Sequence, residues 1–126
     1  GGLSLGFEQL GFEVVIANEY DESIAKAYIK NRPNVNMVVA DITELPIVET
    51  FGKYKGTIDL IVGGPPCQGY SQKGQRKTIH DPRNFLFEFY VKVVKEVAPK
   101  YFVMENVPNL LTAENYNYVY RIGIYS

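Results

Sequence analysis

The sequence predicts a doubly wound α/β fold, in which a mostly parallel sheet alternates with helices. Four apolar runs support this fold class, and three of the four are rich in Val and Ile. Each run is apolar throughout rather than alternating, which is typical of parallel strands covered on both faces. Helical patterns separate the runs, so helices and strands should follow one another in turn along the chain.

The four runs are expected to form strands. They lie within residues 14–21 (VVIANEYD), 37–43 (MVVADIT), 58–67 (IDLIVGGPPC) and 101–107 (YFVMENV). A residue able to do chemistry ends each run: Glu19, Asp41, Cys67 and Glu105. In open α/β sheets the ligand crevice lies outside the carboxyl ends of the strands. We therefore expect the four side chains to converge on one cleft.

Helices are expected over residues 3–11, 21–31 and 84–98. The third is the longest, with apolar residues on one side and Pro99 beyond its end. The second opens with an acidic first turn, which suits a helix N-terminus. Residues 44–55 are ambiguous and leave room for one short helix.

Composition narrows the class of protein. With 126 residues, 46% of them hydrophobic and 21% charged, the chain should form one globular domain. The net charge of −1 requires any nucleic-acid interface to be a local patch. One cysteine and one histidine allow neither an internal disulfide nor a Cys/His zinc site, and no metal is expected. No apolar run approaches the roughly 20 residues of a membrane span.

The first half of the chain has features of a nucleotide site. Gly2 precedes a helical pattern, and Glu19 follows 17 positions later, at the end of the next strand. An acid at about this distance accepts hydrogen bonds from ribose hydroxyls in nucleotide-binding α/β units. Tyr20 could stack on a purine, and Asp41 could accept from its exocyclic amine. Alternatively, Glu19 only neighbours a helix cap and Asp41 forms an Asx turn.

The single cysteine lies on a stiff loop. Pro65 and Pro66 precede Cys67 and disfavour helix there, and a basic tract follows. Positive charge favours the thiolate and attracts phosphates. The alternative is an incidental cysteine in a turn beside a solvated basic loop.

Glu105 directly follows an apolar strand, so its carboxylate should be partly desolvated, which favours the protonated form. A thiolate together with such an acid could attack C6 of cytosine while N3 is protonated or hydrogen-bonded. Carbon C5 would then become nucleophilic and could accept a methyl group from a sulfonium.

Several motifs resemble those of the cytosine-C5 DNA methyltransferases. They occur in the family's order: GGLSLGFEQLGF, ANEYD, ADIT, PPCQGYS, DPRNFLF and MENVPNLL, covering about residues 1–111. The resemblance implies a Rossmann-like, S-adenosylmethionine-dependent methyltransferase fold. It also implies transfer of a methyl group from S-adenosylmethionine to C5 of cytosine in double-stranded DNA, with the base flipped out of the duplex.

The resemblance also assigns roles to residues. It implies that Cys67 is the nucleophile and that Glu105 assists at N3. The implied cofactor-binding residues are Gly2, Glu19, Tyr20, Asp41, Ile42, Pro65 and Leu86. The implied contacts to the base or DNA are Pro66, Gln68, Ser71, Gln75, Arg76, Lys77, Asn106 and Val107.

The match to the family pattern is partial. We expect one incomplete catalytic domain, with a cofactor half (1–57), a catalytic half (58–111) and an unassigned tail (112–126). The family's first strand and C-terminal part are not found, so this stretch alone should be inactive. A bacterial-type, cytoplasmic and nucleoid-associated enzyme is implied, monomeric in full, with a companion restriction endonuclease.

Three alternatives stay open. One is a tRNA cytosine-C5 methyltransferase, because the same cysteine chemistry serves tRNA. Another is a catalytically inactive domain that binds S-adenosylmethionine or a nucleotide. The third is a nicotinamide-dependent oxidoreductase, which would explain Glu19 but leave Cys67 and Glu105 without a role.

Overall fold

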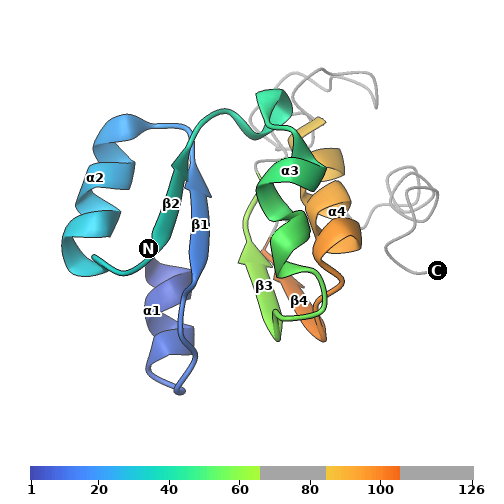
Figure 1. Ribbon diagram of the computed structural model, residues 1–126. Coiled ribbons are helices and arrows are strands. Elements are labelled where there is room, and N and C mark those ends of the chain that lie inside the picture. Colours follow the sequence, from blue (N-terminus) through green and yellow to red (C-terminus); the bar gives the residue numbers. More distant parts are fainter. Residues whose placement is uncertain (66–84, 106–126) are drawn as a thin grey trace, which may run out of the picture. The chain divides into compact units, whose positions relative to one another are not determined.

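A computed structural model of the protein describes residues 1–65 and 85–105, which group into two compact units (Figure 1). The N-terminal unit (Gly1–Pro46) contains α1 (Gly2–Glu8), β1 (Ile16–Glu19), α2 (Glu22–Asn31), β2 (Asn36–Val39) and the 3-10 helix η1 (Ile42–Glu44). The described part of the C-terminal unit, which begins at Ile47, contains α3 (Ile47–Phe51), the 3-10 helix η2 (Gly52–Tyr54), β3 (Leu60–Gly63), α4 (Phe85–Val97) and β4 (Tyr101–Met104).

The N-terminal unit is a β-α-β arrangement. Strands β1 and β2 are parallel, in a register that pairs Ile16 with Asn36 and Glu19 with Val39. Helix α2 lies beside both strands (Figure 1). It begins after Asp21, whose carboxylate accepts hydrogen bonds from the backbone N–H groups of Ser23 and Ile24. Such a cap satisfies donors that the first turn of a helix leaves unpaired.

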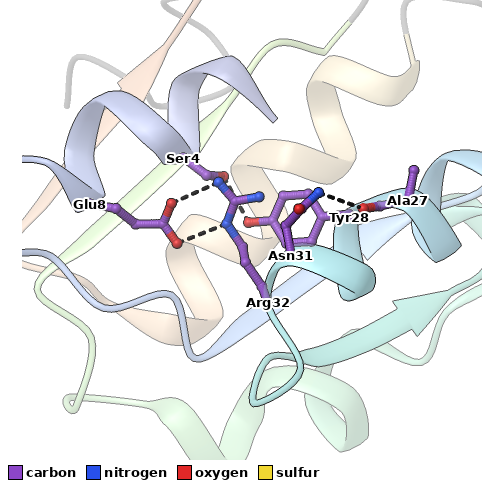
Figure 2. Close-up of polar contacts among 6 residues, drawn as sticks. All are labelled: Ser4, Glu8, Ala27, Tyr28, Asn31 and Arg32. Carbon is purple, nitrogen blue, oxygen red and sulfur yellow. Dashed lines mark hydrogen bonds and ion pairs between the residues drawn. The ribbon is translucent and has the colours of Figure 1, made fainter.

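Helix α1 is joined to α2 by polar contacts (Figure 2). The Arg32 guanidinium donates from Nε and Nη2 to the two carboxylate oxygens of Glu8, at 2.8 and 2.7 Å. The same guanidinium lies 4.4 Å from the ring centroid of Tyr28, whose hydroxyl donates to Ser4 Oγ at 2.8 Å. No residue of α1 is buried, and this polar cluster joins the helix to α2.

The C-terminal unit repeats the parallel pairing around an apolar helix. Strands β3 and β4 pair Leu60 with Tyr101 and Gly63 with Met104. Helix α4 packs against α3, and the buried side chains of this unit come mainly from these two helices. They are Phe51, Phe87, Tyr90, Val91, Val93 and Val97.

The predicted elements are present, with one difference in their surroundings. The described strands form one two-stranded parallel sheet in each unit. The prediction that every strand is covered on both faces is wrong for β4, where Tyr101 is 73% exposed. An apolar run shows that a strand could be buried, but whether it is buried depends on which other elements pack against it. Within the described residues, no helix has the length and apolar character needed to cross a membrane.

Candidate functional site

The carboxyl ends of β1 and β2 form one edge of the N-terminal unit. Glu19 ends β1 and Asp41 follows β2 by two residues, and the backbone N–H of Ala40 donates to the Glu19 carbonyl at 3.1 Å. Because the strands are parallel, both carboxylates lie at the same edge of this sheet. The structure therefore brings Glu19 and Asp41 together, as the sequence predicts.

Local hydrogen bonds use only one of the two carboxylate oxygens of Glu19. Its Oε1 accepts from the backbone N–H of Asp21 at 3.1 Å, so the residue does neighbour a helix cap. Within the described residues, Oε2 has no hydrogen-bond partner and can accept from a ligand. Tyr20, the next residue, is 76% exposed, which leaves its ring available for stacking.

Asp41 likewise forms a local turn through one carboxylate oxygen, and its other oxygen is left for a ligand. Its Oδ1 accepts from the backbone N–H of Thr43 at 2.9 Å and from the Thr43 hydroxyl at 2.8 Å. These bonds, the backbone one first, lower the pKa of Asp41. Its Oδ2 has no partner in the described part of the chain. The Asx-turn interpretation is thus correct, and it leaves an ionised oxygen for a donor such as an amine.

Asn18 sets the spacing of this edge. Its side-chain amide donates to the carbonyls of Val38 and Ala40, each at 3.0 Å, and so ties β1 to the end of β2 directly before Asp41. Sequence reasoning missed this role. The signal was a carboxamide inside the run VVIANEYD, because Asn is disfavoured in strands unless its side chain is bonded.

Within the N-terminal unit, the structure does not bring the predicted cofactor residue Gly2 to this edge. Its neighbour Gly1 lies near Tyr28 and Arg32, toward the end of α2, whereas Glu19 precedes the start of that helix. Gly1, Gly2, Leu5, Glu8, Asn31 and Arg32 line an open pocket of about 460 Å³ there. A Cβ at Gly2 would meet nothing within 4 Å, so the fold itself does not demand glycine.

The C-terminal unit has a second strand-end edge, which carries Glu105. The backbone N–H of Glu105 donates to the Gly63 carbonyl at 2.9 Å and extends the pairing of β3 with β4 by one residue. A Cβ on Gly64 would lie 3.2 Å from Glu105 Oε2, so glycine leaves room for that carboxylate. The expected partial burial of Glu105 is wrong, because its side chain is exposed.

The other predicted residues fall into two groups. Ile42, Pro65 and Leu86 are described and half-buried, with Leu86 in the first turn of α4. Those that lie outside the described residues are Pro66, Cys67, Gln68, Ser71, Gln75, Arg76, Lys77, Asn106 and Val107. Over residues 1–65 and 85–105, no three His, Cys, Asp or Glu side chains are grouped so as to hold a metal ion.

Comparisons with known proteins first define the class. An E. coli prophage-encoded candidate DNA modification methyltransferase superposes with a TM-score of 0.75 at 34% identity, over 98% of this chain and 34% of that protein. The α/β fold is thus that of methyltransferases.

The family follows from the sequence. The family model "C-5 cytosine-specific DNA methylase" matches residues 1–123, so the chain belongs to that family. It is 44% identical over 115 residues to the Type II methyltransferase M.FnuDI of Fusobacterium nucleatum, which covers 91% of this chain. It is 40% identical over 111 residues to M.NgoPII of Neisseria gonorrhoeae, covering 88% of this chain. The chain spans about a third of the length of these relatives, 32% and 31% respectively.

Proposed function

We propose that the chain is the part of a DNA (cytosine-5-)-methyltransferase that binds S-adenosylmethionine and carries the catalytic cysteine and glutamate. The observation that carries this proposal is the pair of carboxylates, Glu19 and Asp41, at one sheet edge of a chain in the C-5 cytosine methylase family. Each carboxylate keeps an oxygen without a partner in the described residues.

The donor set of this edge fits the adenosine part of the cofactor. Glu19 Oε2 would accept from the ribose hydroxyls, and Asp41 Oδ2 from the adenine amine. The exposed ring of Tyr20 and the side chain of Ile42 would flank the base. When bound, S-adenosylmethionine supplies an electrophilic methyl group; Gly2, Pro65 and Leu86 are proposed to contact the rest of it.

The chemistry on the base belongs to Cys67 and Glu105. The Cys67 thiolate would add to C6 of a flipped-out cytosine, and the Glu105 carboxyl would hold a proton or hydrogen bond at N3. Addition would move the ring electrons toward C5, which could then take up the methyl group that the cofactor would supply, leaving S-adenosylhomocysteine. Loss of the C5 proton and of the thiolate would restore the aromatic ring and the free cysteine.

The remaining roles concern DNA. We propose that Gln75, Arg76 and Lys77 meet phosphates, and that Pro66, Gln68, Ser71, Asn106 and Val107 surround the target base. M.FnuDI and M.NgoPII are named Type II methyltransferases. We therefore propose double-stranded DNA as substrate and a restriction endonuclease as companion.

A trapping experiment tests the catalytic half of this proposal. The protein, in its natural full length, is incubated with S-adenosylmethionine and a duplex containing 5-fluorocytosine, whose C5 cannot lose a proton. We expect a covalent adduct by mass spectrometry, absent in Cys67→Ser and slowed in Glu105→Gln. An adduct on tRNA and none on the duplex would reassign the substrate, and no adduct on either would refute the catalytic proposal.

Calorimetry tests the cofactor half. Glu19→Ala should weaken the binding of S-adenosylhomocysteine by about 10-fold or more, since a charge-assisted hydrogen bond contributes about 1.5–3 kcal/mol. Glu13→Ala is the matched control, because Glu13 is an exposed carboxylate of the same unit outside this edge. If both substitutions changed the affinity for S-adenosylhomocysteine equally, Glu19 would not belong to the cofactor site. Binding of NAD instead would favour an oxidoreductase.

A further inference from the structure

We propose that Tyr90 is a positioning residue, which fixes the carboxyl ends of β3 and β4 to each other and thereby sets the position of Glu105. The inference rests on the proposed function, because it concerns the placement of a proposed catalytic group. Tyr90 lies in the middle of α4, within the helix that the sequence predicts over residues 84–98.

The ring of Tyr90 packs against the last residue of β3. A Cβ built on Gly63 would lie 2.5 Å from Cε2 and 2.9 Å from Cδ2 of that ring, which no side chain can tolerate. A side chain at Gly63 would therefore force the buried Tyr90 ring or the end of β3 to shift. In the sequence Gly63 is one of two adjacent glycines, and the structure shows it as a packing contact.

The hydroxyl of Tyr90 binds the other strand. It donates to the Val103 carbonyl at 2.9 Å, one residue before the position paired with Gly63. Only 8% of Tyr90 is exposed, and this burial raises the pKa of its hydroxyl to about 12. The hydroxyl therefore stays protonated, and keeps donating, throughout the pH range in which enzymes usually work.

Both contacts lie directly before the catalytic motifs. The Gly63 carbonyl accepts from the Glu105 backbone N–H, and Gly64 lies against the Glu105 carboxylate. A shift of Gly63 or Val103 would therefore pass to Glu105, and small misplacements of a reacting group cost large factors in rate.

The test compares two Tyr→Phe substitutions in the protein at its natural full length. Tyr90→Phe keeps the ring and removes the hydroxyl that binds Val103. Tyr101→Phe is the matched control, because Tyr101 is 73% exposed on the neighbouring strand. We expect Tyr90→Phe to lower the single-turnover rate of methyl transfer about 10- to 100-fold, with Kd for S-adenosylhomocysteine within about twofold of wild type. Tyr101→Phe should change neither.

A second pair of variants keeps the inference testable should Tyr90→Phe fold poorly. Gly63→Ala introduces the clash with the ring, and Tyr90→Leu removes the ring that causes it. Gly63→Ala should therefore cost at least 10-fold less in rate when combined with Tyr90→Leu than it does alone. Equal costs in both backgrounds would refute the contact. A wild-type protein without any adduct refutes the proposed function, whereas an active wild type with an equally active Tyr90→Phe refutes only the role of Tyr90.

Discussion

The two units differ in what stabilises them. Among the described residues, Ala25 is the one buried apolar side chain of the N-terminal unit, whereas the C-terminal unit buries six. The N-terminal unit depends instead on directed polar contacts: the Glu8–Arg32 pair, the Tyr28–Ser4 bond and the Asn18 side chain. The difference matches the proposed roles in part, because the Asn18 bonds fix the edge that carries the two carboxylates, while an apolar core fixes the strands that lead to Glu105.

The largest expected effect lies in the apolar core. Phe87 on α4 is 1% exposed, and Phe87→Ala should leave a cavity and lower the free energy of unfolding by about 3–5 kcal/mol. Urea denaturation followed by circular dichroism measures this loss. Val48→Ala on α3 is the control, because Val48 is 62% exposed and its loss should stay within about 0.5 kcal/mol. Equal losses would show that α4 does not carry the core of this unit.

A smaller effect is expected from the polar contacts of the N-terminal unit. Asn18→Ala removes two bonds that join β1 to β2 and should cost about 1–3 kcal/mol. Asn31→Ala removes one exposed bond to Ala27, within α2, and should cost less than about 0.5 kcal/mol. The same denaturation experiment measures both. If Asn18→Ala lowered the free energy of unfolding as much as Phe87→Ala does, the two units would not differ in what stabilises them.

The third and smallest effect is the response to pH, which should be opposite in the two units. The hydrogen bond from Arg32 lowers the pKa of Glu8, so its stabilisation is present above the ordinary value of 4.5 and is lost as pH falls through the lowered one. In the C-terminal unit, the hydrogen bond to Asp59 raises the pKa of Lys100, and burial raises that of Tyr90. Their stabilisation is present below about pH 10 and is lost as pH rises further.

Backbone NMR signals recorded across the pH range would report the unfolding of each unit separately. Signals from α2 should lose dispersion first in acid, and signals from α4 first in alkali. Arg32→Met should lower stability at pH 7 and flatten the acid response, because Glu8 then returns to its ordinary pKa. Loss of both sets of signals at the same pH at each extreme would show that the units unfold together and would contradict a unit-specific response.

The order of elements could be predicted from the sequence because it depends on local patterns. The runs ending at Glu19 and Met104 are continuous and apolar, and the face of residues 84–98 has helical spacing. The exposure of Tyr101 and Glu105 could not be predicted, because it depends on which other segments cover β4. Residues 44–55 were ambiguous because little in that stretch sets a clear period, and the structure forms α3 and η2 there. The 3-10 helix η1 begins at Ile42, inside the run 37–43 that was expected to be a strand.

In the candidate site, too, some residues could be predicted from local sequence patterns and others could not. Glu19 and Asp41 were predictable, because the carboxyl ends of parallel strands meet at one edge. Asn18 and Tyr90 were not, because their contacts join residues 20, 22 and 13 positions apart that no periodicity relates. The convergence of all four strand-end residues on one cleft stays a prediction, as do the division at residue 57 and the roles of Cys67 and its neighbours.

The contact between Gly63 and Tyr90 also bears on protein engineering. A designer who transplants the segment from Gly63 to Cys67 onto another scaffold moves a glycine whose lack of a side chain matters only opposite a tyrosine ring. In a host protein without that ring, the space opposite Gly63 is left unfilled. A host that keeps a side chain at the position of Gly63 cannot accommodate the Tyr90 ring of α4 without a shift. The smallest transferable module therefore includes β3, α4 and β4 together.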